Sequence, residues 1–117
     1  MILPTGPIRV LVATRPVDFR KGMDGLAAVV RDSLGGDPYA GVLYVFRAKR
    51  ADRLKLLFWD GTGLCLFAKR LEAGSFRWPR VEGGVMRLTP AQFAALVEGL
   101  DWARVRGTRV PRPTAVS

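Results

Sequence analysis

Three consecutive segments alternate in polarity with a period of two, and they constrain the fold more than any other feature of the chain. They run over Val42 to Arg47, Arg53 to Asp60 and Leu64 to Arg70. A short basic segment separates the first two, and Asp60-Gly61-Thr62-Gly63 separates the last two. A period of two is typical of β-strands, and connections this short favour hairpins. The sequence therefore predicts an antiparallel meander.

Additional strands and a helix are expected on either side of the meander. Before it, Ile8 to Ala13 is rich in β-branched residues and predicts a strand. A helix is then predicted from about residue 23, because apolar residues recur at the spacing of one helix face: Met23, Leu26, Ala27, Val30 and Leu34. After the meander, shorter strands are predicted over Phe76 to Trp78 and Val85 to Leu88.

A second helix has the clearest start signal. Thr89-Pro90-Ala91-Gln92 combines a capping residue, a proline at the first helical position and a glutamine three residues after the cap. We therefore expect one α+β domain over residues 1–102, with an antiparallel β-sheet of about five to six strands and two α-helices. Residues 103–117 are expected to form a flexible tail, because they carry four arginines and no acidic residue.

The charge balance favours an acidic partner. Nineteen Lys and Arg oppose ten Asp and Glu, which gives +9, and 15 of the 19 cations are Arg. The tail accounts for +4 of this charge, and the other +5 belongs to residues 1–102. The tail arginines are Arg104, Arg106, Arg109 and Arg112. Because the planar guanidinium pairs well with phosphate, DNA is the first expected partner.

Several residue types that enzymes and metal sites use are scarce. The chain has no histidine and a single cysteine, Cys65, which excludes His-containing triads, His-containing zinc sites and internal disulfides. We expect no cofactor and no metal. The N-terminal segment, broken by Pro4, Pro7 and Arg9, has neither a signal-peptide core nor a membrane-spanning length. We therefore expect a cytoplasmic protein with no membrane partner.

The meander also predicts which charges share a face of the sheet. With a tight turn after Asp60, Arg53 faces Arg70 across the second hairpin. We expect the first hairpin to place Arg47 on that same face, a grouping that a slip of one residue in the first loop would undo. The candidate DNA-binding residues are Arg47, Lys49, Arg50, Arg53, Lys55, Lys69 and Arg70, together with the tail arginines. The alternative is that these cations only solvate the end of an exposed sheet, with Asp52 and Glu72 as partners.

The other end of the same face is apolar, which suggests a second kind of partner. Leu57, Trp59, Leu64 and Leu66 share this end and form a candidate docking patch for another protein or a second copy of the chain. Trp59 and Trp78 are either core or interface residues or, less simply, stacking platforms for an unpaired base.

The acidic residues give little support to catalysis. A metal-dependent nuclease needs two or three carboxylates that converge on an ion, and Asp18, Asp24 and Asp60 are the best candidates for such a set. No motif joins them, and each has a local explanation: Asp60 begins a turn, and Asp18 and Asp24 flank a helix start. We therefore expect a protein that is not an enzyme.

Several long motifs occur in an order that resembles a known family. They are residues 17–26 (Val-Asp-Phe-Arg-Lys-Gly-Met-Asp-Gly-Leu), residues 58–72 (Phe-Trp-Asp-Gly-Thr-Gly-Leu-Cys-Leu-Phe-Ala-Lys-Arg-Leu-Glu), residues 76–79 (Phe-Arg-Trp-Pro), residues 88–92 (Leu-Thr-Pro-Ala-Gln) and residues 96–102 (Leu-Val-Glu-Gly-Leu-Asp-Trp). Over about residues 9–102 the chain resembles the TnpB accessory protein, the second open reading frame of bacterial transposable elements of the insertion-sequence-66 group. The tail lies outside these motifs.

The resemblance implies a small accessory protein, encoded beside a larger transposase and required for transposition, with no established catalytic chemistry. DNA and the transposase of the same element are its expected partners. The family motif residues form a candidate interaction surface: Asp18, Arg20, Lys21, Asp24, Asp60, Lys69, Arg70 and Glu72.

Overall fold

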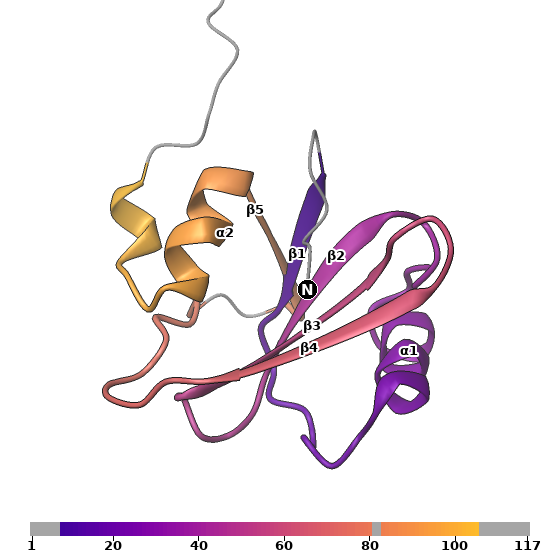
Figure 1. Cartoon of the computed structure of the whole chain (residues 1–117), viewed down its shortest axis with the longest axis horizontal. Coiled ribbons are helices and arrows are strands. Elements are labelled where there is room, and N and C mark those ends of the chain that lie inside the picture. The colour runs from indigo at the N-terminus through magenta and orange to yellow at the C-terminus, as the bar shows by residue number, and fades with distance from the viewer. Residues whose placement is uncertain (1–7, 81–82, 106–117) are drawn as a thin grey trace, which may run out of the picture.

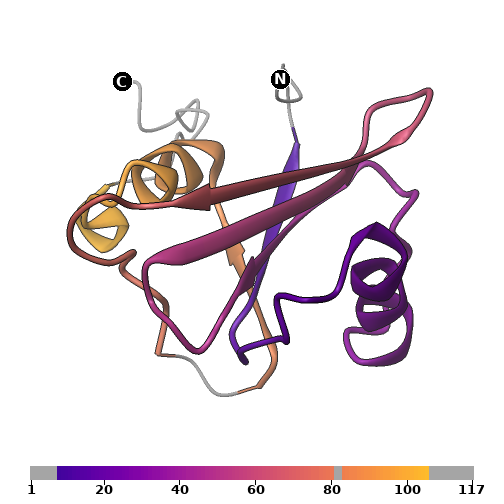
Figure 2. The ribbon, with the colours of Figure 1, turned by 60° about the horizontal axis from the view of Figure 1, so that its bottom comes forward.

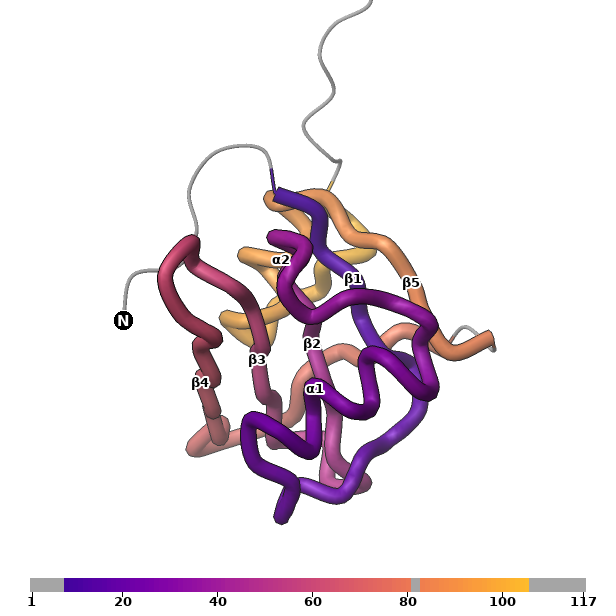
Figure 3. The backbone as a smooth tube through the Cα atoms, turned by 90° about the vertical axis from the view of Figure 1, so that its right-hand side faces the viewer, coloured from indigo at the N-terminus to yellow at the C-terminus, as the bar shows by residue number. Residues whose placement is uncertain are grey.

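The fold is built on a five-stranded sheet with the strand order β4-β3-β2-β1-β5, which Figure 3 shows from left to right. The protein is represented by a computed structural model that describes residues 8–80 and 83–105. The strands are β1 (Arg9–Ala13), β2 (Val42–Arg47), β3 (Arg53–Trp59), β4 (Leu64–Arg70) and β5 (Val85–Leu88). The helices are α1 (Met23–Asp32), α2 (Pro90–Val97) and the short 3₁₀ turn η1 (Trp102–Arg104).

The helices lie on opposite faces of the sheet. Figures 1 and 2 show α1 on one side and α2 with η1 on the other. Leu43 and Val45 of β2 pack with Leu96 of α2, whereas Tyr44 and Phe46 pack with the α1 side. Every residue from Val42 to Phe46 is therefore buried, which explains why β2 is continuously apolar.

The α+β class with two α-helices and five strands is confirmed, and one ladder differs from the expected antiparallel pairing. β1 pairs with β2 in parallel, with Arg9 opposite Val42, and with β5 in antiparallel fashion. A parallel pair needs a long crossover connection, and the segment containing α1 supplies it. The sheet is therefore mixed.

The prediction of a strand over residues 76–78 is wrong. Phe76 is buried and its N–H donates to Ala51 O at 3.0 Å, while the Trp78 indole N–H donates to the same oxygen at 3.1 Å. This segment is thus attached to the turn before β3 through a single carbonyl, with no ladder. The apolar character of this segment reflects packing and not strand formation, because Phe76 and Trp78 complete the core beside α2.

The predicted start of α2 is confirmed by its capping box. Thr89 Oγ1 accepts from Gln92 N at 3.1 Å, and Gln92 Oε1 accepts from Thr89 N at 3.0 Å. After α2 the chain continues into η1, where Asp101 Oδ1 accepts from Ala103 N at 3.2 Å. This turn runs through Arg104, two residues beyond the expected boundary at Trp102.

The described residues bear on two further expectations, the arginine-rich tail and the absence of a membrane-spanning helix. Arg106, Arg109 and Arg112 lie outside the described residues. Within residues 8–80 and 83–105, no helix has the length and apolar character needed to cross a bilayer.

Candidate nucleic-acid interface

The β3–β4 hairpin has the register that the sequence predicted. Arg53 lies opposite Arg70 and Lys55 opposite Ala68. Like charges that face each other across a ladder repel by up to roughly 1 kcal/mol unless an anion lies between them. This end of the hairpin therefore concentrates positive charge where a phosphate is stabilising.

The cations of this region line two adjoining depressions, which together we call the basic cleft. One part, of about 620 Å³, lies between loop 16–20 and turn 48–50. A second part, of about 390 Å³, shares Phe19 and Arg53 with the first and extends to Arg70. The cationic residues that line the basic cleft are Arg20, Lys49, Arg50, Arg53, Lys55 and Arg70, and the acidic ones are Asp18 and Glu72. Lys69 also borders the cleft, but its Nζ lies on the other face of the sheet.

The arginines of turn 48–53 are only partly neutralised. Asp52 Oδ1 lies 3.7 Å from both Arg50 Nε and Arg53 Nε, which is beyond hydrogen-bond distance. The Arg50 side chain is 71% exposed, and Arg70 and Lys49 are also exposed. One carboxylate thus faces two guanidinium groups without hydrogen-bonding to either of them. Arg53 Nε is buried and has no hydrogen-bond partner, whereas most of the Arg50 side chain is open to a ligand.

Asp18 and Arg20 form an ion pair at the rim of the basic cleft. Arg20 Nη2 lies 2.7 Å from Asp18 Oδ2, and Arg20 Nε lies 3.1 Å from the same oxygen. The hydrogen bond from the Arg20 side chain lowers the pKa of Asp18 to about 2. Asp18 therefore stays charged at neutral pH and cancels the charge of Arg20 within the cleft.

Lys55 holds the loop that forms one wall of the basic cleft. Its Nζ donates to Phe19 O at 2.7 Å and to Lys21 O at 3.1 Å. The same Nζ lies 5.0 Å from the centre of the Phe19 ring, within range of a cation–π interaction. The structure thus gives Lys55 an internal positioning role in place of the predicted phosphate contact. Nothing in the sequence distinguishes Phe19, because it becomes a wall of the cleft only once the loop is folded.

The predicted grouping of Arg47 with the other cations is wrong. Arg47 pairs with Leu54, so it shares the face of Leu54 and lies opposite the face of Arg53. Its guanidinium lies 5.4 Å from the centre of the Trp78 ring, and burial lowers its pKa. The register of the first hairpin differs by one residue from the expected one. Residues 48–53 separate the paired residues Arg47 and Leu54, and they carry no turn signature from which the register could be predicted.

Lys69 also contributes differently from the prediction. Alternation along β4 places it on the α2 face of the sheet, opposite Leu54. Its Nζ donates to Val97 O at 2.7 Å and lies 4.0 Å from Glu98 Oε2. Lys69 therefore satisfies a free carbonyl at the C-terminal end of α2, where a cation is favoured.

The predicted apolar docking patch is mostly covered by α1, which corrects that expectation. Leu57 is fully buried, and Leu64 and Leu66 are partly buried against the cluster that contains α1. Trp59 packs edge-on against Tyr39, with ring centres 5.6 Å apart. Alternation along the strands shows that one end of this face is apolar, but it does not show which element covers it. Trp78 is partly buried as well.

The remaining motif residues have local structural roles. Asp60 Oδ1 accepts from Thr62 N at 2.9 Å and from Gly63 N at 2.8 Å, and these bonds lower the pKa of Asp60. Asp24 lies in the first turn of α1, where a negative charge stabilises the helix. Lys21 N donates to Asp18 O at 3.0 Å in the loop that Lys55 holds.

The structure does not assemble the three-carboxylate set that a nuclease would need. Asp18 lines the basic cleft with Arg53, at the start of β3, whereas Asp60 follows the end of that strand. A strand of this length spans roughly 20 Å, so the two carboxylates lie at opposite ends of the hairpin. Among the described residues, no group of three or more His, Cys, Asp or Glu lies close enough to hold a metal ion.

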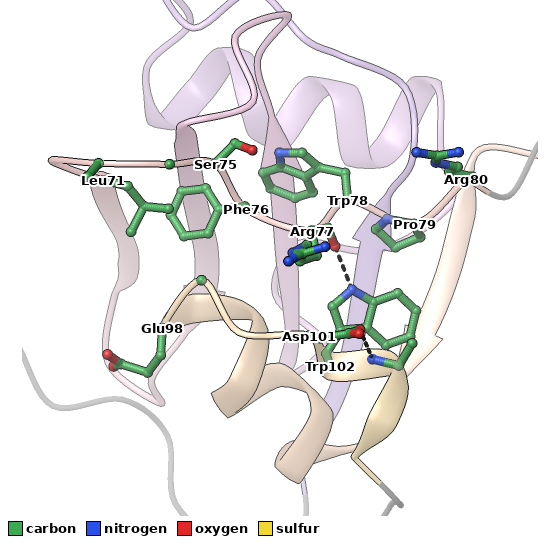
Figure 4. Close-up of a pocket in the computed structure, with 14 residues that line it drawn as sticks. Leu71, Ser75, Phe76, Arg77, Trp78, Pro79, Arg80, Glu98, Asp101 and Trp102 are labelled. Carbon is green, nitrogen blue, oxygen red and sulfur yellow. Dashed lines mark hydrogen bonds between the residues drawn. The ribbon is translucent and has the colours of Figure 1, made fainter.

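A separate cavity, of about 800 Å³, lies between segment 71–80 and the segment that joins α2 to η1 (Figure 4). Trp102, whose indole N–H donates to Arg77 O, forms part of its wall. Glu98 and Asp101 lie on one side, and Arg77 and Arg80 come from the other segment. The only sequence signal for this cavity was the presence of two of the motifs, residues 76–79 and 96–102.

Fold and site together define a small, basic α+β protein with a cationic cleft at one end of its sheet. The family model described as "IS66 Orf2 like protein" matches residues 8–107, and the chain belongs to this family. The family implies an accessory role associated with transposition.

Two curated relatives from Sinorhizobium fredii (strain NBRC 101917 / NGR234) are similar over all or nearly all of their length. Uncharacterized protein y4jC is 51% identical over 117 residues, which cover 100% of both chains. Uncharacterized protein y4hO is 43% identical over 116 residues, which cover 98% of this chain and 99% of the relative. No solved structure matches the chain.

Proposed function

We propose that this chain is a non-catalytic accessory protein of transposition that binds DNA through phosphate contacts in the basic cleft. The observation that carries the proposal is the pairing of Arg53 with Arg70 across the β3–β4 ladder. A phosphate between these guanidinium groups relieves their repulsion and receives charge-assisted hydrogen bonds. Lys49 and Arg50, exposed on the neighbouring turn, contact an adjacent phosphate of the same backbone.

Such a site supplies affinity with little sequence readout. Contacts to phosphate fix the position of a protein on DNA, whereas sequence is read at the base edges. The basic cleft presents guanidinium and ammonium groups on loops and at strand ends, and no helix carries them. We therefore assign it a role in holding DNA, with choice of the element ends left to the transposase. The tail arginines, Arg104 among the described residues, add further phosphate contacts.

The proposal that the chain is non-catalytic rests on the placement of its acidic residues. Asp60 is committed to its turn, Asp18 is paired with Arg20, and the two lie at opposite ends of the hairpin. A two-metal nuclease site needs carboxylates close enough to share ions about 4 Å apart.

A titration of duplex DNA across salt concentrations tests the proposed function. We expect weak binding to any sequence, with log K falling linearly as log salt rises. The same duplex incubated with magnesium should remain intact. Absence of binding at low salt, or cleavage that depends on magnesium, would contradict the proposal.

The second candidate function is docking of the transposase. The candidate surface is not the apolar patch predicted on the β3–β4 hairpin but a different one. Leu100 is 59% exposed and lies between Gly99 and Asp101, which line the separate cavity that has Trp78 and Trp102 in its wall. A large exposed apolar side chain next to an aromatic cavity is typical of protein interfaces. Leu100→Ser should weaken capture of the transposase of the same element and leave DNA binding unchanged. Equal capture by wild type and variant would count against docking at this place.

A further inference from the structure

The two edges of the sheet differ in how well they are protected. β5, at one edge, has four residues and includes the exposed Arg87. β4, at the other edge, has seven residues, and Leu64 to Ala68 contain no charged side chain. Proteins usually protect open edges by shortness or by charge, and β4 has charges only at its C-terminal end. Figure 3 shows β4 at the outer side of the sheet.

The unpaired backbone groups of β4 follow from its hydrogen bonds with β3. Asp60 N donates to Gly63 O at 3.0 Å, and Leu71 N donates to Asp52 O at 3.0 Å. Hydrogen-bonded and non-hydrogen-bonded pairs alternate along an antiparallel ladder, so odd-numbered residues of β4 bond to β3. The backbone groups of the even-numbered residues point to the open edge. These residues are Leu64, Leu66, Ala68 and Arg70.

We propose that β4 pairs in antiparallel fashion with β4 of a second copy of the chain, with the two-fold axis at Phe67. In this register Leu66 lies opposite Ala68 of the second copy, and Leu64 lies opposite its Arg70. Each of these pairs joins outward-pointing backbone groups, so the whole strand is used. The two five-stranded sheets become one continuous sheet across the dimer.

The charges of β4 favour this occupant and this register. Lys69 and Arg70 lie at one end of the strand, so antiparallel pairing brings each basic end to the apolar start of the other strand. No like charges face each other. Phe67 faces its own counterpart at a non-hydrogen-bonded position, where side chains approach most closely and aromatic pairs are favourable. A parallel arrangement would instead place the two basic ends side by side.

A proline scan of the two edges tests the proposal. Ala68→Pro removes an outward N–H from β4 at an exposed position, and Arg87→Pro does the same at the edge of β5. By sedimentation, we expect wild type and Arg87→Pro to be dimers. Ala68→Pro should raise the dimer dissociation constant by at least about tenfold, because it removes hydrogen bonds from both halves of the interface. Circular dichroism establishes that each variant is folded. A monomeric wild type, or a folded Ala68→Pro dimer of unchanged affinity, would refute the proposal.

Cysteine cross-linking tests the register without proline. In a Cys65→Ala background, Phe67→Cys brings two thiols together at the two-fold axis, with Cα atoms about 4.5 Å apart, within the range for a disulfide. The wild-type chain is the matched control, because Cys65 lies opposite Lys69 and is about 13 Å along the strand from its counterpart. Oxidation should yield a covalent dimer of the Phe67→Cys variant only. Failure of this variant to cross-link while the protein sediments as a dimer would also refute the proposal.

Discussion

Replacing Arg53 and Arg70 together by Gln removes the pair of opposed guanidinium groups on which the proposed DNA site rests. The two side chains face each other across β3 and β4, and Arg70 is exposed while Arg53 is partly so. If the two groups hold the one phosphate between them, the slope of log K against log salt falls by about 0.9 when both are replaced. Over a fourfold rise in salt, the variant then loses about 3.5-fold less affinity than wild type.

The measurement is a fluorescence anisotropy titration of one labelled duplex at several salt concentrations. The control variant, Arg31→Gln with Arg87→Gln, changes the net charge by the same amount at exposed positions that do not line the basic cleft. We expect its slope to equal that of wild type. An unchanged slope for the Arg53 and Arg70 variant, or an equal drop for the control, would show that the cleft does not hold phosphate.

Substitutions at three further positions and one truncation test individual parts of the structure. Asp18→Asn should strengthen DNA binding by about threefold at low salt by freeing the charge of Arg20. Arg20 lowers the pKa of Asp18 to about 2, below that of an unpaired carboxyl, so the wild-type carboxylate is fully charged above about pH 4. The difference in affinity between wild type and variant should therefore be constant from about pH 4 to about pH 8. Asp60→Asn should keep the wild-type melting temperature and transposition activity, since an amide oxygen also accepts the turn hydrogen bonds, whereas Asp60→Ala should have a lower melting temperature. Loss of transposition in a folded Asp60→Asn variant would point to chemistry at Asp60. Lys55→Met should lower the free energy of unfolding in urea by about 2 kcal/mol through loss of its two carbonyl contacts, and an unchanged midpoint would mean that they do not hold the loop. Truncation after Val105 should leave the melting temperature unchanged and weaken DNA binding, and equal affinity would remove the tail from the proposed interface.

The sequence alone determined those features that short-range interactions specify. The β3–β4 register follows from a turn in which Asp60 bonds to the backbone two and three residues later, so the pairing of Arg53 with Arg70 could be read from the chain. The start of α2 likewise follows from the reciprocal bonds of Thr89 and Gln92. In both cases the partners lie within a few residues of one another, and their chemistry is visible in the local pattern.

Only the tertiary structure decided which element covers each face and which cations remain free. Residues 48–53 carry no turn signature, so nothing local placed Arg47 beside Trp78 rather than beside Arg53. Lys55 is engaged by carbonyls of a loop more than 30 residues earlier in the chain, and α1 covers Leu57 after a crossover that makes β1 parallel to β2. The periodicity of apolar residues indicates that a face of the sheet is buried. Which element covers that face depends on the packing of segments that are distant in sequence. The composition of the basic cleft was therefore set by long-range contacts, even though its central arginine pair was set by a local turn.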